Sequence, residues 1–118
     1  MEILIAGYSD FEPAIASELI VSAKQAALAQ DGCIACFRAL DAPHPRRVSV
    51  YQEWIGEAAF ANHFAGRSYS DMGAQLRSAG WTGFAVKVYR SDFSEPAYDD
   101  NGLPRGDVFT AGRERDLP

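Results

Sequence analysis

The sequence lacks the features that define several large classes of protein. No apolar run approaches the roughly 20 residues that a membrane helix needs, and the first residues lack the basic region and long apolar run of a secretory signal. The 11 Lys and Arg residues are scattered and are outnumbered by 16 Asp and Glu, which gives a net charge of −5. Nucleic-acid binding instead needs clustered basic residues. We therefore expect a cytoplasmic protein that binds neither a membrane nor nucleic acid.

The sequence also has few residues or motifs that could bind a metal ion or a nucleotide. The two histidines, His44 and His63, have no companion at a spacing typical of metal ligands, and no glycine-rich loop of the kind that cradles phosphates is present. Cys33 and Cys36 have the C-x-x-C spacing of a redox pair or half a zinc site. The apolar residues between and after them are typical of a buried strand, so we favour two buried, unreactive thiols and expect no metal.

What the sequence does contain indicates one folded domain followed by a polar tail. The chain has 118 residues, of which 47% are hydrophobic and 23% are charged, and this length and composition suit a single domain with its own core. Residues 93–118 are rich in Pro, Gly, Asp and Arg, with Val108 and Phe109 as the apolar anchors. We expect a domain over residues 1–92 and a tail that is either disordered or an arm lying on a partner.

The hydrophobic period changes from strand to helix near the N-terminus. Met1–Tyr8 predicts a first strand. Ser9 or Asp10 is then predicted to cap a helix, with Pro13 in its first turn, and Gly32 is predicted to end it. The stripe that predicts this helix repeats every four residues: Phe11, Ile15, Leu19, Ala23 and Ala27.

Further changes of period predict the remaining elements. We expect a second strand over Cys33–Leu40, a proline-containing loop over Asp41–Pro45 and a third strand over Arg47–Ile55. We then expect a short helix over Glu57–Phe64, loop and helical turns over Gly66–Ala79 and a fourth strand over Trp81–Asp92. The resulting order, βαββαβ, predicts an α+β fold with a four-stranded antiparallel sheet and helices on one face, the ferredoxin-like arrangement. Both faces of the later strands carry apolar residues, so we expect a second copy to cover the other face in a homodimer.

Three short segments resemble the antibiotic biosynthesis monooxygenase family, which includes quinol monooxygenases. They are Asp31–Cys33 after the long helix, Val50–Trp54 on a strand and Ala59–His63 on the next helix. The resemblance covers about residues 1–92. It implies a dimeric α/β barrel in which two sheets pack face to face, with a pocket between the sheet and helices of each subunit. Enzymes of this family oxidise electron-rich phenols, quinols or anthrone-like polyketides with molecular oxygen, without flavin or metal.

The family also contains haem-degrading members, which differ from this chain at two positions. In those proteins the position of His63 is usually Trp, and a haem-ligating His follows about three helical turns later, where this chain has Gly73. The resemblance therefore implies a protein without haem or another cofactor.

His63 and Trp54 are the candidate catalytic residues. An imidazole can accept a phenolic proton near neutrality, although a helix histidine that bonds to the sheet and helps to close the dimer is an alternative. Trp54 can stack on a planar substrate or donate its indole N–H to an oxyanion, with a core position as the alternative.

Alternation along the third strand places Glu53 relative to Trp54, and other candidates follow from their chemical type. Glu53 is predicted to lie on the opposite face from Trp54, where we expect a salt bridge to Arg38 on the neighbouring strand. The candidates for substrate binding are three polar orienting groups and two parts of an apolar wall: Tyr51, Arg67, Tyr69, Phe60 and Phe84.

Three functions are compatible with these residues. The first is a cofactor-independent monooxygenase of a phenolic, quinol or polyketide-like aromatic substrate, with His63 as proton acceptor. The second is a non-catalytic small-molecule-binding or stress-response module. The third is an acid-base isomerase or decarboxylase that does not use oxygen.

Overall fold

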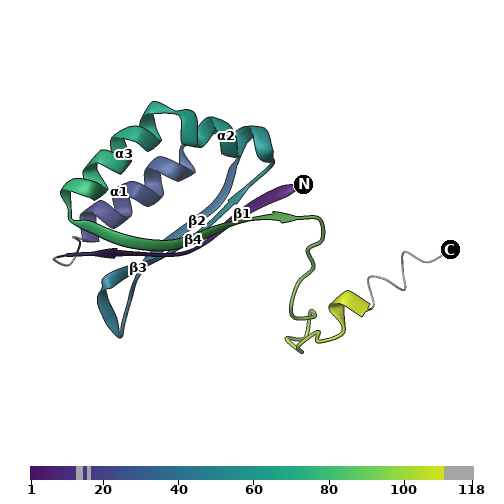
Figure 1. Ribbon diagram of the computed structural model, residues 1–118. Coiled ribbons are helices and arrows are strands. Elements are labelled where there is room, and N and C mark those ends of the chain that lie inside the picture. The colour runs from purple at the N-terminus through teal and green to yellow at the C-terminus, as the bar shows by residue number, and fades with distance from the viewer. Residues whose placement is uncertain (13–14, 16, 111–118) are drawn as a thin grey trace.

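The computed structural model describes residues 1–12, 15 and 17–110, and shows a four-stranded antiparallel sheet with helices on one face (Figure 1). In chain order the elements are β1 (Glu2–Phe11), α1 (Ser17–Leu28), β2 (Cys33–Asp41), β3 (His44–Trp54), α2 (Glu57–Ala65), α3 (Arg67–Ser78) and β4 (Trp81–Ser91). The strands lie in the order β2-β3-β1-β4. The predicted α+β, ferredoxin-like fold is confirmed. Within the described ranges, no helix is long and apolar enough to cross a membrane.

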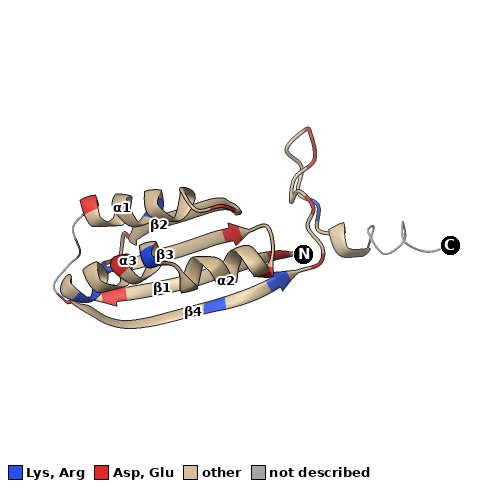
Figure 2. Cartoon of the chain, turned by 90° about the horizontal axis from the view of Figure 1, so that it is seen from above, with Lys and Arg blue, Asp and Glu red and all other residues tan. Residues whose placement is uncertain are grey.

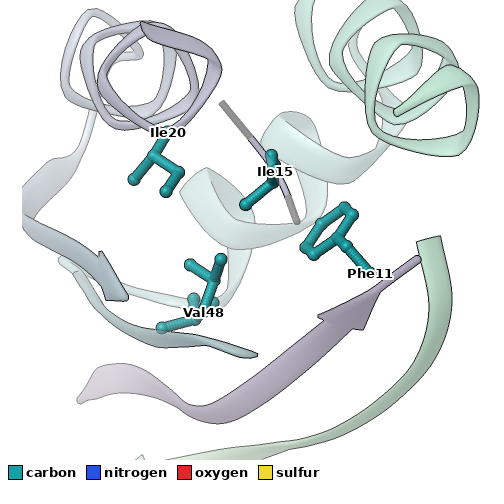
Figure 3. Close-up of a cluster of buried hydrophobic side chains, with 5 residues drawn as sticks. Phe11, Ile15, Ile20 and Val48 are labelled. Atoms are coloured by element: carbon teal, nitrogen blue, oxygen red, sulfur yellow. The ribbon is translucent and has the colours of Figure 1, made fainter. Parts of the chain in front are cut away.

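Alternation along the central strands separates a helix-facing side of the sheet from an open side. Ile3 of β1 lies opposite Trp54 of β3, and both are buried beneath the helices. At the other end of the sheet a second cluster joins β1 and β3 to α1. Figure 3 shows Phe11 and Val48 packing with Ile15 and Ile20 in this cluster. The core is therefore a single layer between the sheet and its helices.

The first strand is longer, and the first helix starts later, than the sequence predicted. Ser9 and Asp10 do not cap a helix, because Ser9 pairs with both neighbouring strands and the Asp10 carboxylate accepts hydrogen bonds from Arg47. Phe11 is the last residue of β1. These long-range pairings override the local capping signal. Pro13, predicted in the first helical turn, lies outside the described residues.

Two other boundaries also differ from the prediction. His44–Trp54 is one strand, because Asp41 pairs with His44 across a two-residue turn and Pro45 is accommodated within β3. The predicted loop and helical turns after Gly66 are a regular helix, α3. Gly66 separates the two helices, since its N–H donates to the His63 carbonyl while its own carbonyl accepts from Ser70.

Among the described residues, no helix covers the open side of the sheet (Figure 1). This side carries aromatic side chains. Phe37 and Tyr89 are 58% and 47% exposed, and Tyr51 stacks on Phe37 with ring centroids 6.1 Å apart. Figure 2 shows acidic and basic residues interspersed over the domain, so the view shows no basic cluster. An uncovered aromatic sheet face of this kind is unusual for a protein that works as a monomer.

Residues 93–110 form an arm that leaves the domain after β4 (Figure 1). The Asp99 carboxylate accepts hydrogen bonds from the N–H groups of Asn101 and Leu103, both at 2.9 Å. Phe93 contacts Phe109 with ring centroids 5.5 Å apart. The described part of the tail therefore has local structure of its own, built on an Asx turn.

Gly7 is a position where the pairing of β1 with β4 requires glycine. Its φ is 154°, and a Cβ atom there would lie 2.0 Å from the Ala85 carbonyl oxygen. We expect Gly7→Ala to lower the free energy of unfolding by about 1–3 kcal/mol or more, measured by urea denaturation. Gly83→Ala is the matched control, because a Cβ atom at Gly83 meets nothing within 4 Å. Equal stability of the two variants would contradict this account.

The open face also generates a prediction about assembly. We expect the protein to sediment as a dimer at micromolar concentration, and Ala6→Arg, which places a charge in the middle of this face, to shift it to the monomer. Ala74→Arg, at an exposed position of α3, should leave the dimer intact. A wild-type protein that sediments as a stable monomer would remove the prediction.

Candidate functional site

A cavity of about 320 Å³ lies between the helix-facing side of the sheet and the helices α2 and α3. Apolar side chains from β1, β3, β4, α2 and α3 form most of its wall. In Figure 2, no helix of the described chain lies above the edge strand β4. Five polar residues interrupt this wall: Ser9, Arg38, Gln52, His63 and Tyr69. This volume and mixture of groups are typical of sites for small organic molecules.

His63 is positioned by α2 and held by aromatic rings. It is 7% exposed, and its ring stacks on Trp54 with centroids 4.5 Å apart and an interplanar angle of 28°. Because α2 ends just before Gly66, the first turn of α3 brings the Tyr69 ring close to His63, with ring centroids 5.3 Å apart and an interplanar angle of 69°. The imidazole therefore has little rotational freedom at the cavity wall.

The hydrogen-bonding capacity of His63 is not used within the described chain. Its Nδ1 atom is buried and has no partner, and no hydrogen bond joins the side chain to the sheet in the described ranges. Burial, and then the charge of Arg38, lower the pKa of His63 below its usual range. The ring is therefore neutral at pH 7, with one nitrogen able to accept a proton.

Trp54 lies behind His63 and does not line the cavity. It is fully buried, and its indole N–H donates to the Gln52 side-chain oxygen at 3.0 Å. This N–H is consequently not free for a substrate oxyanion. Because the Gln52 oxygen accepts this hydrogen bond, the amide N–H groups of Gln52, which lines the cavity, are its remaining donors. Trp54 acts on the site by supporting the His63 ring.

Arg38 points to the helix-facing side of the sheet, contrary to the predicted salt bridge with Glu53. The strand pairing shifts between Cys33 and Ala35, which leaves Arg38 opposite Val50. Glu53 lies on the open side, where its carboxylate accepts a hydrogen bond from the Tyr51 hydroxyl at 2.6 Å. That bond, with burial, raises the pKa of Tyr51 to about 12. Arg38 is thus separated from the carboxylate that we expected to neutralise it.

The structure brings together only part of the predicted substrate-binding set. Tyr69 and Phe84 line the cavity together with His63. Tyr51 lies on the opposite face of the sheet, Phe60 packs beside Ile3 in a separate surface hollow, and the exposed Arg67 lies 4.0 Å from Asp71.

Several cavity residues were missed by the sequence analysis: Ser9, Arg38, Gln52, Phe64 and Trp81. Gln52 shares the face of Trp54 by simple alternation, so it could have been identified. Arg38 could not, because the irregular pairing of β2 is not visible in the sequence.

The two cysteines lie on a strand, as predicted. Both are free thiols on β2, with Cys36 buried and Cys33 half-buried. Burial, followed by the proximity of Cys36, raises the pKa of Cys33, which disfavours the reactive thiolate. Among the described residues, no group of His, Cys, Asp and Glu is arranged to hold a metal ion.

The fold and the cavity together define a ferredoxin-like protein with a cavity between its sheet and helices. No family model matches the chain, and no curated protein matches its sequence. Solved structures do match its fold, and many of them share it.

Three of these structures illustrate the similarity. A proposed antibiotic biosynthesis monooxygenase from Deinococcus radiodurans aligns with a TM-score of 0.67 and 18% identity, over 80% of this chain and 96% of that one. Rv0793 from Mycobacterium tuberculosis gives 0.68 and 16%, over 81% and 100%. A mutant of SnoaB, a cofactor-independent oxygenase from Streptomyces nogalater, gives 0.65 and 13%, over 80% and 97%. The predicted resemblance to the antibiotic biosynthesis monooxygenases is confirmed at the level of fold.

The environment of His63 predicts its titration. We expect an imidazole pKa below 6.5, measured by NMR on a chain with only two histidines. Because the unfolded chain binds this proton more readily, stability should fall as the pH drops from about 6.5 through the pKa of the folded state.

A variant assigns the effect to the His63 ring. His63→Phe keeps an aromatic ring beside Trp54 and should flatten the dependence of stability on pH in this range. A His63 pKa at or above 6.5 would contradict the structural description.

Proposed function

We propose that this protein is a cofactor-independent monooxygenase that acts on a phenolic, quinol or polyketide-like aromatic substrate. The observation that carries the proposal is His63, a buried, neutral imidazole with an unpartnered Nδ1 on the wall of an otherwise mainly apolar cavity. The likeness in fold to SnoaB, described as a cofactor-independent oxygenase, supports the choice of reaction.

The chemistry requires binding, orientation and deprotonation of the substrate. The apolar wall, including Phe84 and Trp81, accommodates an aromatic ring, and Tyr69 is placed to orient a hydroxyl group. His63 accepts a proton from the substrate, and the resulting electron-rich anion can pass an electron to oxygen. For a ring CH₂ group the reaction balances as CH₂ plus O₂ giving C=O plus H₂O.

Trp54 contributes by holding the base in place. The stack at 4.5 Å and the hydrogen bond to Gln52 fix the plane of the His63 ring relative to the cavity. A general base must keep its acceptor atom within hydrogen-bonding reach of the proton it removes. We therefore assign His63 the acid-base role and Trp54 a positioning role.

Oxygen uptake with a panel of hydroquinones and anthrones tests this function. We expect wild-type protein to consume oxygen and His63→Phe to lose roughly 100-fold or more of the rate, because general base catalysis typically contributes this much. His44→Asn, whose histidine lies outside the cavity, should retain the wild-type rate. Circular dichroism of each variant establishes that it is folded.

Two results would contradict the proposed monooxygenase function. Product formed without oxygen uptake would identify an acid-base isomerase or decarboxylase. Tight binding of panel compounds without turnover or uptake would identify a binding module.

A further inference from the structure

Arg38 is a half-buried cation for which the described chain provides no counterion. Its Nε atom is buried without a hydrogen-bond partner, and no Asp or Glu of the described ranges forms an ion pair with it. Leaving such a charged donor unsatisfied is costly, and native proteins rarely do so without a function. The partner of Arg38 is therefore expected to come from outside the described chain.

The cavity itself indicates where that partner binds. Arg38 and His63 line it together, and they also share a smaller recess of about 40 Å³. Arg38 Nε and His63 Nδ1 are the two buried side-chain atoms without partners in the described part of the chain. Two residues of one cavity wall, each with a buried polar atom that has no partner, point to the same ligand.

The polar groups around this point favour negative charge. Arg38 supplies a guanidinium, Gln52 its amide N–H groups, and Ser9 and Tyr69 hydroxyl groups. Of the ionisable groups that line the cavity, β2 supplies Arg38, α2 supplies His63 and α3 supplies Tyr69, whereas β1, β3 and β4 supply none. The wall thus carries a positive charge and several donors, with no carboxylate.

We propose that the cavity binds its aromatic ligand as an anion, with the negative oxygen held by Arg38 next to His63. This inference rests on the proposed function. When the ligand enters as a phenol, its O–H bond breaks, the proton passes to His63 and the electron pair stays on oxygen. The anion then lies between two cations, which offsets the repulsion that Arg38 would otherwise exert on a protonated His63. The shared chemistry is an anionic oxygen on an aromatic ring, either an ionised hydroxyl or a carboxylate.

Three probes test this without relying on turnover. They are 4-nitrophenol, whose ionised form is yellow, 4-nitroanisole, which cannot ionise, and 4-nitrobenzoate, which carries a carboxylate. On the full-length protein we expect the pKa of bound 4-nitrophenol to fall by about one unit or more, because a cation within a few ångströms produces shifts of this size. We also expect that at least one of the two anions, 4-nitrophenolate or 4-nitrobenzoate, binds at least tenfold more tightly than 4-nitroanisole.

Variants identify Arg38 as the cause. Arg38→Gln should abolish the shift in the 4-nitrophenol pKa and the preference for anions, while retaining the affinity for 4-nitroanisole, which shows that the cavity is intact. Arg38→Lys should restore part of the preference because it restores the charge. Arg46→Gln removes a positive charge from the same β2–β3 hairpin outside the cavity, and should behave as wild type.

The outcomes separate this proposal from the proposed function. Anion binding that depends on Arg38, without oxygen uptake, keeps the present proposal and removes the monooxygenase. Tighter binding of 4-nitrobenzoate than of 4-nitrophenolate assigns the anion as a carboxylate. Binding of 4-nitrophenol in its neutral form, unchanged binding by Arg38→Gln, or no binding of any probe would overturn the proposal.

Discussion

The stack between Trp54 and His63 is the contact on which the site depends. Trp54 is fully buried on β3 and His63 lies on α2, so their rings join the helix layer to the sheet at the cavity. The hydrogen bond from Trp54 to Gln52 satisfies the indole N–H, which would otherwise be buried at a cost. The same contact places a neutral imidazole at the wall of the cavity. Packing and candidate chemistry are thus consequences of one interaction.

Periodicity predicted the fold because most strands alternate regularly. The predicted separation of Glu53 and Trp54 is confirmed, since Glu53 bonds to Tyr51 on one face while Trp54 bonds to Gln52 on the other. The boundaries failed where long-range contacts outweigh local signals. Ser9 and Asp10 are good helix caps, yet their pairing within the sheet extends β1 to Phe11.

The candidate site was predicted less completely, because it draws on six elements, one of which is the irregular strand β2. His63 could be selected from the sequence, because an imidazole can accept a phenolic proton near neutrality and the segment Ala59–His63 carries the family resemblance. Arg38 depends on the shifted pairing of β2 near Cys33, which turns it away from Glu53 and toward the cavity. Tyr51 illustrates the opposite case, because it was a candidate for orienting a hydroxylated ligand while the pleat places it on the open face beside Glu53.

We propose that one cavity beside His63 holds an aromatic ligand with its acidic oxygen directed at Arg38 and the imidazole. A crystal structure of the protein soaked with a naphthol would show this arrangement. We expect density for the ring against Phe84 and Trp81, with the ligand oxygen within hydrogen-bonding distance of Arg38 or His63. Density on the open face of the sheet, or a ring in the cavity with its oxygen directed away from both residues, would contradict it.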